Sequence, residues 1–292
     1  MNISIGQLID KSWATYRSDF FFYLKIALWF LIPATVYAIG VLMAPASTNA
    51  ALVELRGLTG IERAGLFIEY RVTGIVLLIT MAFVGNLTLK HLQLSEQGQS
   101  SVTTLKDALV PRLLPLAGHV ILKYVIISLP FVFILPGFLM AFFAVRYELG
   151  ILGLVSVLFV ILGAIVGILV TLWIWLRLFL SYPLFTNDGL GIWESLKVSY
   201  KMTKGKFWPI AARLLVTKGI YLIALILLSL GLLILAAIFF TIVPFTSETI
   251  LVKTSLIASN LISIAPLALI VPLWYIVDFE LFQELKRSVT SK

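Results

Sequence analysis

Cysteine is absent from the chain, and histidine occurs only at His91 and His119. Without thiols, the protein has no disulfides, iron–sulfur clusters, thiolate zinc sites or cysteine nucleophile. Two histidines also argue against a histidine-based metal centre, so we expect neither a metal nor a cofactor. Charge is scarce as well: 12% of the 292 residues are charged and 61% are hydrophobic, whereas soluble proteins have about 25% charged residues. This composition excludes a soluble protein and indicates an integral membrane protein.

Long apolar stretches dominate what is present. A helix that crosses the hydrocarbon of a bilayer needs about 20 apolar residues, and six stretches meet this need: Phe20–Met43, Val72–Leu89, Leu113–Val145, Leu149–Phe185, Phe207–Val243 and Thr254–Val277. The short alternating segments of a β-barrel do not occur. We therefore predict an all-α membrane protein with six transmembrane helices. The third stretch exceeds one bilayer thickness, and Pro130 and Pro136-Gly137 predict a kink in it.

Lysine and arginine are distributed unevenly around these spans. If the N-terminus is cytoplasmic, fifteen of the 22 Lys and Arg residues flank the cytoplasmic ends of the spans, and five flank the outer ends: Arg56, Arg63, Arg71, Arg146 and Lys253. Cytoplasmic loops of membrane proteins carry an excess of these residues. We therefore predict that both termini are cytoplasmic, which agrees with an even number of spans.

Short amphipathic segments precede the first, third and fifth spans: Ile5–Arg17, Val102–Val110 and Ile192–Lys204. A shift of 187 positions places similar residues of the first on the last: Ser12 on Ser199, Trp13 on Tyr200, Arg17 on Lys204, Phe20 on Phe207 and Phe21 on Trp208. The middle segment matches less closely. We predict one membrane domain, 1–292, made of three repeats of an in-plane helix plus a two-span hairpin, at about residues 4–93, 101–186 and 190–287.

The last amphipathic segment is rich in lysine, and four of these residues form a candidate contact for anionic lipids: Lys197, Lys201, Lys204 and Lys206. In an in-plane helix, basic residues lie toward the headgroups while aromatic residues such as Trp193 dip below them. Ordinary topology signalling on a solvated face is the alternative. The net charge of +8 is explained by such flanking residues, so we expect lipids and not nucleic acid as partners.

Three parts of the chain carry a family resemblance: Gly191–Trp208, Ile9–Trp13 with Tyr16, Arg17 and Phe20, and Pro136-Gly137. The first resembles a hallmark of prokaryotic proteins similar to the glycerophosphoryl diester phosphodiesterase membrane domain. The other two resemble the opening and the mid-chain span break of that family. The resemblance covers essentially the full chain. It implies a six-span module of the bacterial or archaeal plasma membrane, which is sometimes fused to a catalytic barrel.

Motifs of common catalytic sites are missing. The chain has no Walker-type loop, no H-E-x-x-H, no G-x-S-x-G and no dinucleotide fingerprint. A phosphodiesterase barrel needs carboxylates and histidines in a soluble domain, and no segment of the chain has that composition. We therefore expect no enzyme activity. We expect His91 to be a polar residue at the membrane interface. His119 lies about one turn from Lys123; a structural role is expected for it, and a proton relay is the alternative.

Charged residues within or at the ends of the spans form a candidate intramembrane polar cluster: Lys123, Arg177, Lys218, Asp278 and Glu280. A charge near the bilayer centre costs several kcal/mol unless it is paired, is neutralised or reaches the interface. Snorkelling of the side chain to the cytoplasmic face is the simplest explanation for the shallower residues, Lys123 and Arg177.

Lys218 lies deeper, because it follows Trp208 by ten residues, or roughly 15 Å of helix. The fifth and sixth spans are consecutive and antiparallel, so the early part of one lies beside the late part of the other. We therefore predict that Lys218 pairs with Asp278. Glu280, or a carbonyl freed by a proline of the sixth span, is the alternative partner.

Small residues recur at helical spacing in the fourth span: Gly153, Ser156, Gly163 and Gly167. Such a stripe lets two helix backbones approach closely. Packing within the bundle is the favoured interpretation, and homodimerisation is the alternative.

These features favour a non-enzymatic membrane protein that acts as a structural, lipid-associating or partner-binding module. The alternative is a small transporter, or the membrane subunit of an export system, with a cavity that faces the cytoplasm. A deep cation with a carboxylate partner and water access would favour transport, whereas a solidly packed bundle would favour the module.

Overall fold

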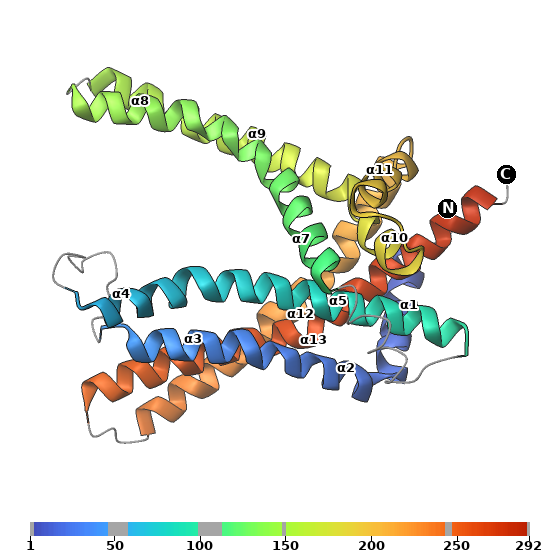
Figure 1. Cartoon of the computed structure of the whole chain (residues 1–292), viewed down its shortest axis with the longest axis horizontal. Coiled ribbons are helices and arrows are strands. Elements are labelled where there is room, and N and C mark those ends of the chain that lie inside the picture. The colour runs from blue at the N-terminus through green and yellow to red at the C-terminus, as the bar shows by residue number, and fades with distance from the viewer. Residues whose placement is uncertain (1–2, 46–57, 99–112, 148–149, 243–246, 291–292) are drawn as a thin grey trace. The chain divides into compact units, whose positions relative to one another are not determined.

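The structure is a computed structural model that describes residues 3–45, 58–98, 113–147, 150–242 and 247–290, all of which are helical or in short connections, with no strand among them (Figure 1). Six helical stretches are long and apolar enough to cross a membrane: Phe20–Met43, Gly60–Glu96, Leu114–Arg146, Gly150–Asn187, Phe207–Ile242 and Glu248–Ser288. The prediction of an all-α protein with six such helices is therefore confirmed.

Two of the spans are longer than the sequence predicted. The second begins at Gly60. The side chain of Thr59 accepts a hydrogen bond from the backbone N–H of Glu62, and the Glu62 carboxylate accepts one from the backbone N–H of Thr59. This reciprocal cap satisfies the free N–H groups of the first turn. The sixth begins at Glu248 and continues through both of its prolines. The prediction from apolar runs included only the part of each helix that hydrocarbon would surround. Both helices continue beyond that part through polar and charged turns.

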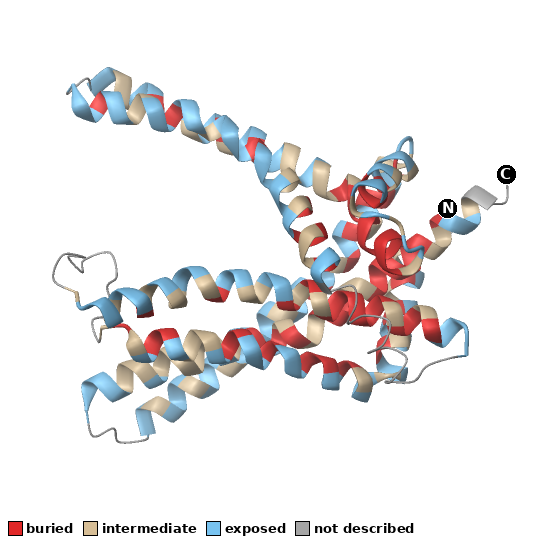
Figure 2. Ribbon diagram, viewed as in Figure 1, coloured by how far each residue is buried: buried red, intermediate tan, exposed pale blue. Residues whose placement is uncertain are grey.

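The chain divides into two compact units, Met1–Pro111 with Arg213–Lys292, and Arg112–Ala212. Each is described by itself. The first unit contains α1 (Ile5–Ser18), α2 (Phe20–Ala27), η1 (Leu28–Phe30), α3 (Leu31–Met43), α4 (Gly60–Phe67), the π-helix η3 (Ile68–Val72), α5 (Thr73–Glu96), most of α12 (Phe207–Ile242) and α13 (Glu248–Thr290). Within it, α13 packs against α1, α2, α3 and α5. Its buried residues gather in the later half of α13 and on the helices that contact it (Figure 2).

The second unit contains α7 (Leu113–Ser128), the 3-10 helix η5 (Leu129–Ile134), α8 (Leu135–Arg146), α9 (Gly150–Arg177), α10 (Ser181–Asn187) and α11 (Ile192–Met202). The break at η5 begins next to Pro130, where the sequence predicted a kink. The small-residue stripe of α9 faces η5 and α8. A Cβ on Gly163 would collide with the carbonyl oxygen of Phe133, and one on Gly167 would lie 3.3 Å from that of Pro130. The stripe therefore packs within its own hairpin.

Much of the apolar surface has no protein cover inside either unit. From Leu222 to Ile242, no residue of α12 is buried, and α8 and α9 are exposed along most of their length (Figure 2). Apolar surface of this extent is unfavourable in water but is solvated by hydrocarbon.

Helices occur at two of the three segments expected to lie in the membrane plane, α1 and α11. The third, Val102–Val110, lies outside the described residues. The threefold repeat and the in-plane orientation of these helices stay predictions.

Candidate functional site

Lys218 and Asp278 form an ion pair between α12 and α13. The Nζ atom of Lys218 lies 2.7 Å from Oδ1 of Asp278, and their side chains are 14% and 9% exposed. This is the pairing that the antiparallel geometry of the last two spans predicted. Two charges at this level of burial stabilise a structure only when they compensate each other.

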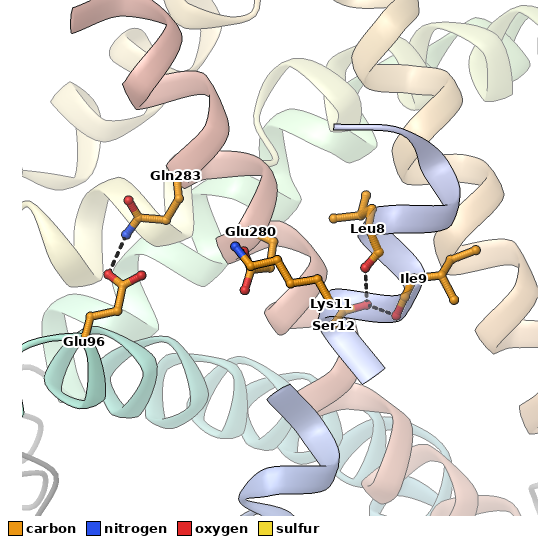
Figure 3. Close-up of polar contacts among 7 residues, drawn as sticks. All are labelled: Leu8, Ile9, Lys11, Ser12, Glu96, Glu280 and Gln283. Atoms are coloured by element: carbon orange, nitrogen blue, oxygen red, sulfur yellow. Dashed lines mark hydrogen bonds and ion pairs between the residues drawn. The ribbon is translucent and has the colours of Figure 1, made fainter. Parts of the chain in front are cut away.

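Glu280, the second carboxylate of α13, pairs with a different helix. Its side chain is 7% exposed and contacts Nζ of Lys11 on α1, which is 50% exposed (Figure 3). Asp278 and Glu280 therefore connect α13 to α12 and α1, respectively. Lys11 was absent from the predicted cluster because it precedes the first apolar span.

Further polar contacts fix α1 on α12. The hydroxyl oxygens of Ser12 and Tyr221 lie 2.8 Å apart, and Nε of Arg213 donates to the carbonyl oxygen of Ile3 at 2.7 Å. Ser12 is fully buried, and its hydroxyl also donates to the carbonyl of Leu8 (Figure 3). The spacing of Arg213 and Tyr221, eight residues apart, places both on one face of α12.

Two more polar pairs lie on α5. Nε2 of His91 is 3.1 Å from Oδ2 of Asp19, and Nε2 of Gln283 donates to Oε2 of Glu96 at 2.9 Å (Figure 3). His91 is 8% exposed, so protein covers it and it is paired with Asp19; its place at the membrane interface stays a prediction. On α1, burial raises the pKa of the Tyr16 phenol to about 12, and its ring stacks on Tyr23 at 5.2 Å between centres.

In the second unit, Lys123 and His119 lie against aromatic rings. Lys123 is 5% exposed, with Nζ 4.1 Å from the centre of the Tyr182 ring. His119 is fully buried between Tyr182 and Phe185, each 4.9 Å away between ring centres, and neither ring nitrogen has a hydrogen-bond partner. The expectation that Lys123 snorkels is therefore wrong, because α10 covers it.

Arg177, the last residue of α9, is surrounded by rings. Its Cζ atom lies 5.4 Å from the Trp173 ring, 5.2 Å from Tyr200 and 5.4 Å from Phe207. The guanidinium nitrogens Nε and Nη1 are buried and have no hydrogen-bond partner. The hydroxyl of Ser199 donates to the carbonyl oxygen of Arg177 at 2.7 Å, which ties α11 to the end of α9. The predicted cluster thus contains different kinds of site: Lys218, Asp278 and Glu280 are ion-paired in one unit, and Lys123 and Arg177 contact rings in the other.

Helix α11 has two distinct faces. Ser195, Leu196 and Ser199 are buried, whereas its lysines and aromatic residues are exposed. Glu194 is exposed as well. The exposed lysines and aromatic residues of the helix and of the turn after it form what we call the α11 face: Trp193, Lys197, Tyr200, Lys201 and Lys204. Nζ of Lys197 lies 5.5 Å from the Trp193 ring. Lys206, the fourth predicted lysine, is half-buried in the turn after the helix.

This turn redirects the chain from α11 into α12. Gly205 has a φ of 79°, a left-handed conformation that glycine adopts without a steric penalty. Directly after the turn, Trp208 is 79% exposed. Phe21, at the start of α2, is 76% exposed. Both positions carry a large aromatic residue where a span begins, as is typical of a membrane interface.

An apolar groove of about 260 Å³ lies between the first span and α13. Leucine, isoleucine, phenylalanine and alanine line it, and the small residues Ala27, Ala34, Ala265 and Ala268 provide the space. Such a lining suits hydrocarbon and not a polar solute.

The described residues contain no group of three or more His, Asp or Glu side chains placed to hold a metal ion. The sequence drew attention to charged residues in apolar runs and predicted the partner of Lys218, but it missed Lys11 and the aromatic and hydroxyl partners on other elements. Tyr182, Tyr200 and Tyr221 are ordinary aromatic residues in the sequence, and only the fold reveals their contacts with Lys123, Arg177 and Ser12.

Six long apolar helices and the interior charges that they carry define a multi-pass helical membrane protein. Comparison of the chain with protein-family models, with curated proteins and with solved structures finds no match. The resemblance to the phosphodiesterase membrane domain therefore stays a prediction, and a functional proposal depends on the geometry.

Proposed function

We propose that the protein is a non-enzymatic, lipid-associating membrane module whose α11 face binds the headgroups of anionic lipids. The observation that carries this proposal is the segregation of α11: its serines and leucine pack inward while lysines and aromatic residues share the outer surface. Trp193 is 56% exposed and Tyr200 44%. Aromatic residues of this kind favour the headgroup level of a bilayer.

Charge gives the face its preference for anions. Lys197, Lys201 and Lys204 are all exposed, and a lysine near an anionic leaflet contributes about 1 kcal/mol. This corresponds to about fivefold in affinity for each lysine. The apolar groove of the first unit supports lipid association by independent chemistry, because its lining suits an acyl chain.

The Lys218–Asp278 pair is the observation that favours the runner-up, a transporter. Both side chains are largely buried, and their contact connects two neighbouring helices. We propose that this pair has a structural role, which agrees with the module and requires no solute pathway.

The test compares two triple variants with the same loss of charge. K197Q/K201Q/K204Q removes the lysines of the α11 face, and R63Q/R71Q/R146Q removes three exposed arginines elsewhere. Each protein is purified in mild detergent from a mixture of phosphatidylglycerol and phosphatidylcholine, and mass spectrometry measures the ratio of the bound lipids.

We expect the unmodified protein and the arginine variant to enrich phosphatidylglycerol, and the lysine variant to lose at least fivefold of this enrichment. Equal enrichment in the two variants would show that net charge, and not the α11 face, attracts the lipid, and it would overturn the proposal.

A further inference from the structure

We propose that Arg177 completes the α11 face as a binding site for a phosphate group. This inference rests on the proposed function, and it adds the chemical class that the site recognises. A lysine face attracts any anion, whereas the planar guanidinium of arginine matches the oxygens of a phosphate with paired N–H donors.

The three rings explain how Arg177 is held, but they provide no hydrogen-bond acceptor for its Nε and Nη1 atoms. Cation–π contacts use the face of the guanidinium, whereas its five N–H donors lie in the plane. Nε and Nη1 are buried without an acceptor. Arg177 forms no ion pair within the described part of the chain. A positive charge in this setting is costly unless an anion compensates it.

Arg177 is half-buried as a residue, while its Nε and Nη1 atoms are buried, so a phosphate must reach the guanidinium at the edge of the ring cage. Tyr200 belongs both to the ring cage and to the α11 face, and its neighbour Lys201 is exposed. The Ser199 hydroxyl holds the backbone of Arg177 to the same helix. Ser199 and Tyr200 therefore connect Arg177 to the helix that carries the exposed lysines.

The rings also preorganise the site. Trp173 comes from α9, Tyr200 from α11 and Phe207 from the start of α12, so three elements fix the plane of the guanidinium before a ligand arrives. Arginine that is already ordered loses less conformational entropy on binding. The rings also exclude water, which strengthens the attraction between the guanidinium and a phosphate.

The experiment separates phosphate recognition from general attraction of anions. Protein in nanodiscs is offered phosphatidylglycerol, which has a phosphodiester, or a fatty acid, which has a carboxylate, each with one negative charge in a phosphatidylcholine background. The measured quantity is the preference for the phosphodiester, as the ratio of the two affinities. R177K is compared with the unmodified protein, because lysine keeps the charge but not the planar donors.

We expect R177K to lower this preference at least fivefold and to retain most of the attraction to both anions. An unchanged preference, or an equal loss of affinity for both lipids, would overturn the inference. Failure of the proposed function looks different, because K197Q/K201Q/K204Q would then bind anionic lipids as the unmodified protein does.

Y200L serves as a second variant if R177K does not fold. It removes one ring from the cage and leaves Arg177 and all the lysines in place, so we expect a loss of about twofold in the phosphodiester preference. No loss would count against the inference. Inorganic phosphate in the same assay distinguishes the source: displacement of the lipid at millimolar phosphate assigns the site to free phosphate, and no displacement assigns it to a lipid headgroup.

Discussion

The two units hold their interior cations in different ways. In the first unit, Lys218 and Lys11 contact the carboxylates of Asp278 and Glu280. In the second, Arg177 lies among three aromatic rings and forms no ion pair within the described residues. A carboxylate neutralises a lysine, whereas a ring stabilises a cation but leaves its full charge in place.

This difference separates structural from binding roles. The ion pairs of the first unit connect α13 to α12 and α1, and they have no net charge with which to attract a ligand. The rings around Arg177 hold a cation beside the helix that carries the exposed lysines, and we propose that this charge binds an anion. The contrast therefore predicts that removing a cation destabilises the first unit more than the second.

The largest effect is expected for Lys218→Met. This change leaves Asp278 as a buried carboxylate without its lysine, which costs about 3–5 kcal/mol in the free energy of unfolding. Thermal unfolding in detergent measures the loss. Lys218→Met combined with Asp278→Asn should recover part of it, because the second change removes the uncompensated charge. Additive losses in this double-mutant cycle would show that the two residues are not coupled.

A smaller loss of stability is expected for a change at the close backbone contact between α9 and η5 in the second unit. Gly163→Ala places a methyl group against the carbonyl oxygen of Phe133 and should cost about 1–3 kcal/mol through overpacking. Gly153→Ala is the matched control, since its Cβ would lie 3.9 Å from that of Ala144. Thermal unfolding of the two variants tests the comparison, and equal stability would contradict the close approach of η5 to α9.

The smallest effect is expected for Glu280→Gln, which breaks the contact between α13 and α1. Lys11 is half exposed and can be hydrated when unpaired, so the cost is about 1 kcal/mol. Hydrogen exchange of the α1 amides should become faster, because α1 opens more often. Asp10→Asn, which changes an exposed acid of α1, is the control. Faster exchange in the control alone would mean that Glu280 does not secure α1.

Most of the helical framework could be predicted because it depends on local patterns. The apolar run of the first span predicts both of its ends, Phe20 and Met43, and Pro130 predicts the break at η5. The Lys218–Asp278 contact also followed from the sequence, because consecutive antiparallel helices restrict which residues can meet. The second span was predicted too short, because the cap at Thr59 adds turns that are not apolar.

The remainder depends on contacts between residues far apart in the chain. Lys11 and Glu280 are separated by nearly the full sequence, and the Ser12–Tyr221 contact links α1 to the fifth span. Lys123 illustrates the limit: its position in an apolar run predicted snorkelling, whereas packing by α10 buries it against Tyr182. Hydrophobic patterns identify the helices but not which side chains cover one another.

The most direct test of the central claim is to map where an anionic lipid touches the protein. Phosphatidylglycerol with a photoreactive group on its headgroup is cross-linked to the protein in nanodiscs, and mass spectrometry of peptides locates the label. The account predicts labelling concentrated on residues 191–208, and little labelling there by the corresponding phosphatidylcholine. Labelling of the Lys11–Glu280 region as strong as that of 191–208, or the same pattern with both lipids, would contradict it.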